Sequence, residues 1–261
     1  VGEYVDVMEG IGWENSEIAT GSTILIRPNQ TTPDADGNTV YADKRVRQAL
    51  AMAVDNNICL ELGYANKGAP ADNHHAGSMH PEHDPSVGRL PYDPAKAKAL
   101  MAEAGMADYE HELISIDDDW RKNTTDAVAA QLRDAGIKVK RTILPGSTFW
   151  NDWAKYPFSS TNWNHRPFAV QVWGLAYRSG EAWNEMGWSN AEFDALLAEA
   201  NAIADADKRR VVAGKCQALI AEEGCTIQPY WRSLYRSHSS NTVCDMHIAY
   251  HAHVYKWGFK A

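Results

Sequence analysis

The sequence lacks the features of a membrane-spanning, nucleic-acid-binding or catalytic protein. No window approaches the roughly 18 consecutive uncharged apolar residues that a spanning helix needs. Lys and Arg number 25 against 34 Asp and Glu, and a net charge of −9 gives no general attraction for nucleic acid. No G-x-S-x-G, H-E-x-x-H, P-loop or G-x-G-x-x-G motif occurs in a fitting context. We therefore expect a protein that is not an enzyme and has no nucleic-acid partner.

Cysteine is scarce, with four residues and no C-x-x-C pair. This disfavours zinc-ribbon and thioredoxin-type sites. Cys59 and Cys216 fall within helical patterns and are expected to act as small core residues. Cys225 and Cys244 flank a strand-like segment and could pair in an oxidising compartment. Four cysteines allow three full pairings, and the sequence does not choose among them.

The first residues contain neither a starting Met nor the charged and apolar regions of a signal peptide. Residues 1–7, V-G-E-Y-V-D-V, alternate like a strand edge. We therefore expect a processed or truncated chain.

The 261 residues have an ordinary globular composition, 44% apolar and 23% charged, but are rich in large rings. Ten Trp and eleven Tyr are present. Such side chains fill cores and also line pockets for small organic ligands.

Strand-like and helix-like segments alternate along the chain, which predicts an α/β fold with a largely buried sheet. The expected helices cover 44–58, 94–104, 123–135, 148–155, 191–202 and 207–222, and the expected strands cover 4–8, 22–27, 111–116, 137–143, 168–176, 226–231 and 233–236. Residues 63–92 and 177–190 are expected to be long loops, which in compact proteins are often functional.

Several segments resemble one known family. Residues 44–55, K-R-V-R-Q-A-L-A-M-A-V-D, resemble the helix signature of the periplasmic solute-binding proteins of ABC transporters, family 5, which includes peptide, oligopeptide and nickel receptors. Residues 92–101, 189–197, 205–221 and 227–230 are similar to its later landmarks, in the family's order, from about residue 40 to 235.

The resemblance implies a type II periplasmic-binding-protein-like lobe, with a mixed β-sheet flanked by helices. Residues 40–232 would form the second ligand-binding lobe, 1–39 a remnant of the first lobe and hinge, and 233–261 the returning tail of the first lobe. Residues 1–33 and 233–261 are expected to associate outside the sheet of the second lobe. The implied protein is a monomer in the periplasm, or lipid-anchored at the cell surface. It would capture a peptide or similar small solute by hinge closure and deliver it to a membrane permease.

Family ligands lie on loops at strand ends, and two loops fit that position. The first contains Asp117, Asp118 and Trp120, although Asp118 or Asp119 could instead cap the next helix and Trp120 could anchor the core.

The second loop contains Trp173, Tyr177, Arg178, Glu181 and Trp183. The family's peptide receptors have G-W-x-x-D at such a place, where the Asp pairs with the peptide amino group. Here that Asp is missing and Arg178 is present. We expect Arg178 to bind a ligand carboxylate opposite Asp117 or Asp118, which favours a zwitterionic solute. The alternative is a pair with Glu181 or Glu185 inside the loop.

Two other groups have weaker patterns. Residues 163–167 could lie on the cleft rim or form an ordinary turn. His74, His75, His80 and His83, and likewise His247, His251 and His253, have spacings compatible with a metal, so a nickel or other metal receptor is the alternative. Histidines in such loops are usually solvated, however. We therefore expect them to be partly exposed and too far apart to coordinate, with no metal or cofactor. A hydrolase, the alternative from another class, has no supporting motif.

Overall fold

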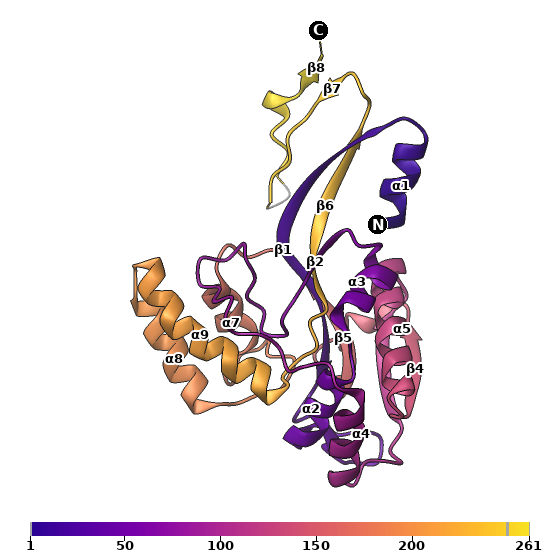
Figure 1. Cartoon of the computed structure of the whole chain (residues 1–261), viewed down its shortest axis with the longest axis vertical. Helices are drawn as coiled ribbons and strands as arrows, with labels where there is room; N and C mark the ends of the chain where they lie inside the picture. The colour runs from indigo at the N-terminus through magenta and orange to yellow at the C-terminus, as the bar shows by residue number, and fades with distance from the viewer. Residues whose placement is uncertain (1, 249–250, 261) are drawn as a thin grey trace.

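A mixed six-stranded sheet lies between two groups of helices in the computed structural model, which describes residues 2–248 and 251–260 (Figure 1). The strand order is β2-β6-β1-β5-β3-β4. The strands are β1 (Glu14–Pro28), β2 (Gly68–Pro70), β3 (His111–Ile116), β4 (Val139–Leu144), β5 (Phe158–Trp163) and β6 (Tyr230–His238). β3 runs parallel to β4 and β5, whereas β1 is antiparallel to β5 and β6. This architecture confirms the predicted fold class.

Helices cover both faces of the sheet. One face carries α2 (Lys44–Met52), α3 (Asn56–Tyr64), α4 (Pro94–Glu103) and α5 (Asp119–Asp134), and the other carries α7 (Ala169–Ala176), α8 (Ala191–Ala202) and α9 (Ala206–Glu223). Shorter elements are α6 (Gly146–Phe149) and the 3-10 turns η1 (Val40–Ala42) and η2 (Val254–Lys256). In β1, Ile24 and Ile26 belong to the first core and Leu25 to the second, because successive strand residues face opposite sides.

The outer half of β1 leaves the sheet together with β6. Glu14–Ala19 pairs with Ser233–His238, and this two-stranded ribbon projects beyond the helices (Figure 1). Helix α1 (Gly2–Gly10) folds back beside the ribbon, where Asp6 pairs with Lys67 at 2.8 Å. At the outer end of the ribbon, β7 (Thr242–Val243) pairs with β8 (Gly258–Phe259).

The inner half of β1 corrects one expectation. Residues 22–28 pair with β5 or β6 in the middle of the sheet, so the expectation that residues 1–33 lie outside it was wrong for this segment. The reason is burial: Ile24, Leu25 and Ile26 are completely buried, which requires cover on both faces. The division of the chain into lobes stays a prediction.

Two expected strands are helices. Residues 4–8 lie in α1, while Val1 lies outside the described residues. Residues 169–176 form α7, whose most deeply buried residues Ala169, Val172, Trp173 and Ala176 follow a helical spacing. A short run that is apolar throughout fits a buried strand and a buried helix equally well, which explains the error.

The strand that takes the predicted central place is β5, F-S-S-T-N-W, which the sequence patterns missed. Two of its three buried hydroxyl groups are hydrogen-bonded to neighbouring elements: Thr125 Oγ1 donates to Ser160 Oγ at 2.8 Å, and Thr161 Oγ1 donates to Glu185. A central strand can therefore be polar in sequence when its side chains have partners.

Helix starts are better predicted, because Asp43, Asp93 and Asp205 each cap a helix by accepting a backbone N–H bond. The expected helix 44–58 divides into α2 and α3, because Asp55 caps a second start.

All four cysteines are free, so the possible Cys225–Cys244 bond is not formed. No helix within the described residues is long and apolar enough to cross a membrane.

Candidate ligand-binding site

A tryptophan-lined cavity lies where β5 ends. Its volume is about 300 Å³ and its lining consists of Trp150, Trp153, Thr161, Asn162, Trp163, Asn164, Arg166 and Trp183. Trp163 is nearly buried, whereas Trp150 and Trp183 are 42% and 47% exposed. The rings of Trp163 and Trp183 meet edge to face, with centroids 5.8 Å apart. The cavity thus combines an apolar wall with accessible rings, as pockets for small organic ligands do.

A buried ion pair holds this wall in place. Arg27 Nε lies 2.7 Å from Glu185 Oε2, and both side chains are completely buried. Glu185 also accepts hydrogen bonds from Thr161 Oγ1 at 2.6 Å and Trp163 Nε1 at 2.8 Å. Burial lowers the pKa of Arg27, and the charge of Glu185 opposes that shift.

Arg27 also reaches the loop before β5, where it donates to the carbonyl oxygens of Trp153 and Tyr156. Glu185 belongs to the loop after α7. Through Arg27, strand β1 therefore holds two of the loops that line the cavity, the one before β5 and the one after α7.

The polar side of the cavity is cationic. Arg166 donates only to the nearby carbonyl oxygens of Asn164 and His165, and no acidic partner for it occurs among the described residues. No Asp or Glu belongs to the described lining either. Next to the cavity, Arg121 donates to Asn162 Oδ1 at 2.8 Å, but its charge is paired with Asp118, also at 2.8 Å. Arg166 is consequently the guanidinium left for an anionic ligand group.

Of the eight residues expected in the site, Trp183 lines this cavity. Trp173 and Tyr177 are completely buried: Trp173 Nε1 donates to the His74 carbonyl, and the Tyr177 hydroxyl contacts His75 Nδ1. Trp120 packs edge to face on Tyr64 and beneath the Arg232 guanidinium, 4.3 Å away. These three rings therefore belong to the packed interior.

The charged residues of the expected site are not brought together. Arg178 pairs with Glu181 within their own exposed loop, which was the alternative interpretation. Asp118 stands at the N-cap of α5, makes no capping bond and pairs with Arg121, while Asp117 is exposed. The expected opposition of Arg178 and Asp117 or Asp118 is therefore not formed among the described residues.

The observed cavity lies away from the loop expected from sequence because residues 169–176 form helix α7 and not the predicted strand. The loop after the buried strand is 164–168, not 177–190, so it carries His165 and Arg166 instead of Arg178. Residues 163–167, expected as rim or turn, supply three of the lining residues. The available signal was Trp163-Asn164-His165-Arg166-Pro167, a ring and a cation before a Pro that lies two residues ahead of α7.

The histidines also depart from expectation. His74, His75 and His80 are buried, and burial lowers the pKa of both His74 and His80 to about 4. Two groups bring their potential ligand atoms within 4.8 Å of one another, namely Asp72, His74 and His83, and His247, His251 and His253. The expectation that these side chains are too far apart to coordinate was therefore wrong.

Comparison with known proteins identifies the family. The model of the bacterial extracellular solute-binding proteins, family 5 Middle, matches residues 3–184, and the chain belongs to this family. It is a family of binding proteins, not of enzymes.

Curated relatives include heme-binding protein A of Haemophilus influenzae, 26% identical over 69% of this chain and 35% of the relative. Di/tripeptide-binding protein 3 of Pseudomonas aeruginosa is 26% identical over 78% of this chain and 40% of the relative. The chain thus spans well under half the length of these relatives.

Solved structures share the fold. The oligopeptide-binding protein AppA of Bacillus subtilis, in complex with a nonapeptide, matches 99% of this chain and 55% of its own with a TM-score of 0.83 and 19% identity. NikZ of Campylobacter jejuni, in complex with Ni(L-His), matches 98% of this chain and 56% of its own with a TM-score of 0.82 and 16% identity.

Proposed function

We propose that this chain is the ligand-holding part of the substrate-binding component of an ABC importer for a peptide or similar small organic solute. Family membership supports the class. The observation that carries the proposal is the tryptophan-lined cavity with the unpaired Arg166.

The cavity chemistry favours a ligand with a flat or apolar body and an anionic group. Trp150, Trp163 and Trp183 offer rings for stacking, and Asn162 and Thr161 offer polar atoms that fix orientation. Arg166 suits a carboxylate, which it can bind through two parallel hydrogen bonds. The loop after β5 carries no Asp to receive a peptide amino group, so a free carboxylate is the anchor we propose.

A metal-receptor function is less well supported at this cavity. Its described lining contains no His, Cys, Asp or Glu side chain. The alternative of a nickel receptor therefore has no ligands for a bare cation there.

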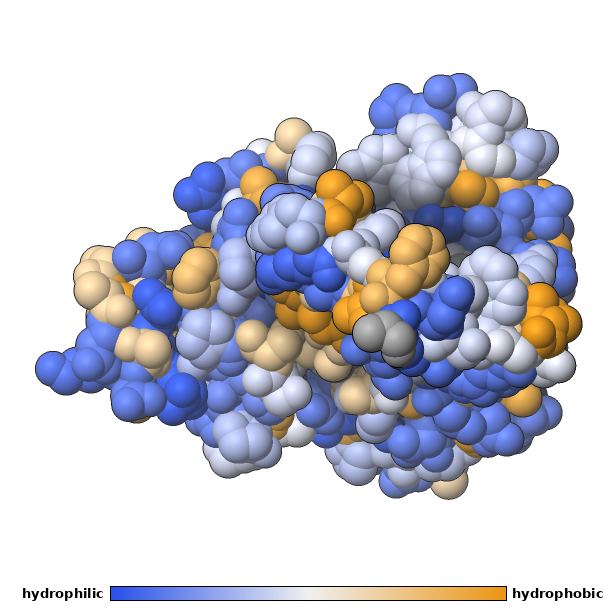
Figure 2. Space-filling model, turned by 90° about the horizontal axis from the view of Figure 1, so that it is seen from above, coloured by the Kyte–Doolittle hydropathy of each residue, from blue (hydrophilic) through white to orange (hydrophobic). Residues whose placement is uncertain are grey.

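Capture would proceed by closure of a second lobe over the cavity, with the β1–β6 ribbon as the connection. Large apolar side chains at the ribbon's outer end are exposed, among them Ile11 at 65%, Tyr255 at 78% and Phe259 at 82%. Seen from this end, apolar residues are scattered among polar ones (Figure 2). Such exposure supports the proposal that residues 1–39 and 233–261 pack in the other lobe, except for residues 22–28, which lie in the sheet of this one.

The family also supports a place outside the cytoplasm, periplasmic or lipid-anchored, and a permease as partner of the closed form. We propose that the protein acts there as a monomer.

The test begins with the ligand. Mass spectrometry of the solute that co-purifies with the complete protein identifies it, and calorimetry then compares two arginine variants. Arg166→Ala should weaken binding by about 2–5 kcal/mol, because it removes a charge contact that closure would bury. Arg178→Ala, the matched control, removes an exposed arginine already paired with Glu181 and should leave affinity unchanged. The opposite ranking would contradict the proposed cavity and restore the loop expected from sequence.

A further inference from the structure

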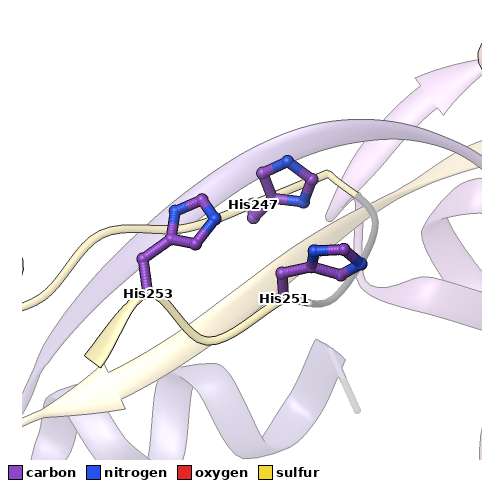
Figure 3. A group of neighbouring side chains, drawn as sticks. All are labelled: His247, His251 and His253. Carbon is purple, nitrogen blue, oxygen red and sulfur yellow. The ribbon is translucent and has the colours of Figure 1, made fainter. Parts of the chain in front are cut away.

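Three histidines of the C-terminal tail converge beside the ribbon (Figure 3). His247 comes from the segment after β7, and His251 and His253 come from the segment before η2. Their ligand nitrogens all lie within 4.8 Å of one another. The ring centroid of His247 lies 4.7 Å from that of His251 and 4.9 Å from that of His253.

A carboxylate orients one of the three rings. His253 Nδ1 lies 2.8 Å from Asp245 Oδ2, so the ring donates this N–H and keeps its lone pair on Nε2. Asp245 is itself held, because Trp257 Nε1 donates to its Oδ1 at 3.2 Å and Arg236 donates to its backbone oxygen. Carboxylate–histidine pairs of this kind fix the ring that binds a metal in many protein sites.

In the second histidine group, the central ring is already held by hydrogen bonds of the fold. His74 is buried, and both of its ring nitrogens are engaged, Nε2 with the Val87 carbonyl and Nδ1 with the Ala76 N–H. A metal at Asp72, His74 and His83 would have to break those bonds, whereas His253 can keep its bond to Asp245 while Nε2 binds a metal.

We propose that His247, His251 and His253 form a binding site for Zn²⁺ or a similar first-row divalent cation, with Asp245 orienting His253. Three imidazoles suit zinc, nickel or copper and not calcium or magnesium, which prefer oxygen ligands. Zinc–nitrogen bonds of about 2.0–2.1 Å imply that the three nitrogens draw closer on binding. His251 is exposed, so the cation reaches the site from solvent, and a fourth position is left for water. This site lies outside the proposed solute cavity and does not depend on the proposed function.

The test uses untagged protein stripped with a chelator and titrated with ZnCl2 by calorimetry. We expect one zinc per chain. His251→Ala should raise the dissociation constant more than 10-fold or abolish binding, and Asp245→Asn should raise it about 10- to 100-fold. His83→Ala is the matched control, because it removes a histidine of the other group and should leave zinc binding unchanged.

Circular dichroism shows whether each variant keeps its fold, and His247→Gln replaces His251→Ala if the latter does not. The proposal is overturned if the wild-type chain binds no zinc, if His251→Ala binds it as tightly, or if His83→Ala is the variant that loses it.

Discussion

At the scale of single residues, the Arg27–Glu185 pair links the sheet to the candidate site. Neither side chain is exposed, and the carboxylate also receives hydrogen bonds from Thr161 and Trp163. Removing one charge would leave the other buried without a partner, which is a costly arrangement.

Glu185→Gln should therefore lower the free energy of unfolding by about 3–5 kcal/mol, measured by urea denaturation. Glu181→Gln is the control, since its partner Arg178 is 55% exposed and the pair is worth at most about 1 kcal/mol. Equal effects of the two changes would contradict a structural role for the buried pair.

Buried histidines make stability depend on pH. Burial lowers the pKa of His111 from 6.5 to about 4, and its ring contacts the Tyr41 hydroxyl at 3.1 Å. Between these two values the unfolded chain binds the proton that the folded chain excludes, so stability falls as the pH drops from 6.5 towards 4.

His74 and His80 act in the same direction. We expect each of these histidines to add a slope of up to about 1.4 kcal/mol per pH unit in that window. His111→Gln should make the free energy of unfolding depend less steeply on pH, as measured by urea denaturation across a pH series. An unchanged dependence would show that folding does not lower the pKa of His111.

At the scale of elements, the close contact of α3 and α5 depends on a glycine. A Cβ at Gly63 would lie 2.8 Å from the Thr124 Cα, a backbone atom that cannot move aside alone. By contrast, a Cβ at Gly174 in α7 would meet no atom within 4 Å.

Gly63→Ala should accordingly destabilise the protein by about 1–3 kcal/mol, although alanine favours helices. Gly174→Ala should be neutral or stabilise by up to about 1 kcal/mol, because only the helix preference remains. Thermal unfolding of both variants tests the pair, and a stabilising change at position 63 would refute the tight contact.

Element types were predictable where local chemistry decides them. The helices α2 and α4 begin after the caps Asp43 and Asp93 at the predicted residues, and β3 was predicted with its observed bounds. The failures were elements whose type depends on their neighbours. Helix α7 is apolar because it packs between the sheet and α8, and β5 is polar because Thr125 and Glu185 lie beside it. The predicted site was misplaced for the same reason. Because the central strand is β5 and not residues 168–176, the loop at its end is 164–168 and not 177–190.

At the scale of the whole molecule, the body, which is a sheet between two layers of helices, and the tail differ in how they are stabilised. Phe193 is completely buried in the core over α7–α9, whereas Phe259 in β8 is 82% exposed.

Phe259→Ser should change the free energy of unfolding by less than about 0.5 kcal/mol and reduce binding of a hydrophobic dye. Phe193→Ser should destabilise the body by about 3 kcal/mol or more. A large loss of stability from the change at 259 would mean that the tail is part of the folded body, against the proposed division into lobes.

Strand β1 is continuous from Glu14 to Pro28, and its pairing with β6 is irregular only between Ala19 and Ser22. At that irregularity the Gly21 N–H donates to His165 Nδ1 at 2.9 Å, and a Cβ on Gly21 would collide with the same ring. His165 precedes Arg166 in the loop that borders the cavity. Strand β1 therefore connects the outer ribbon to the loop that carries Arg166. We expect a displacement of the outer ribbon to be transmitted through Gly21 and His165 to the loop of Arg166, because the inner part of β1 is paired with β5 and held in the sheet.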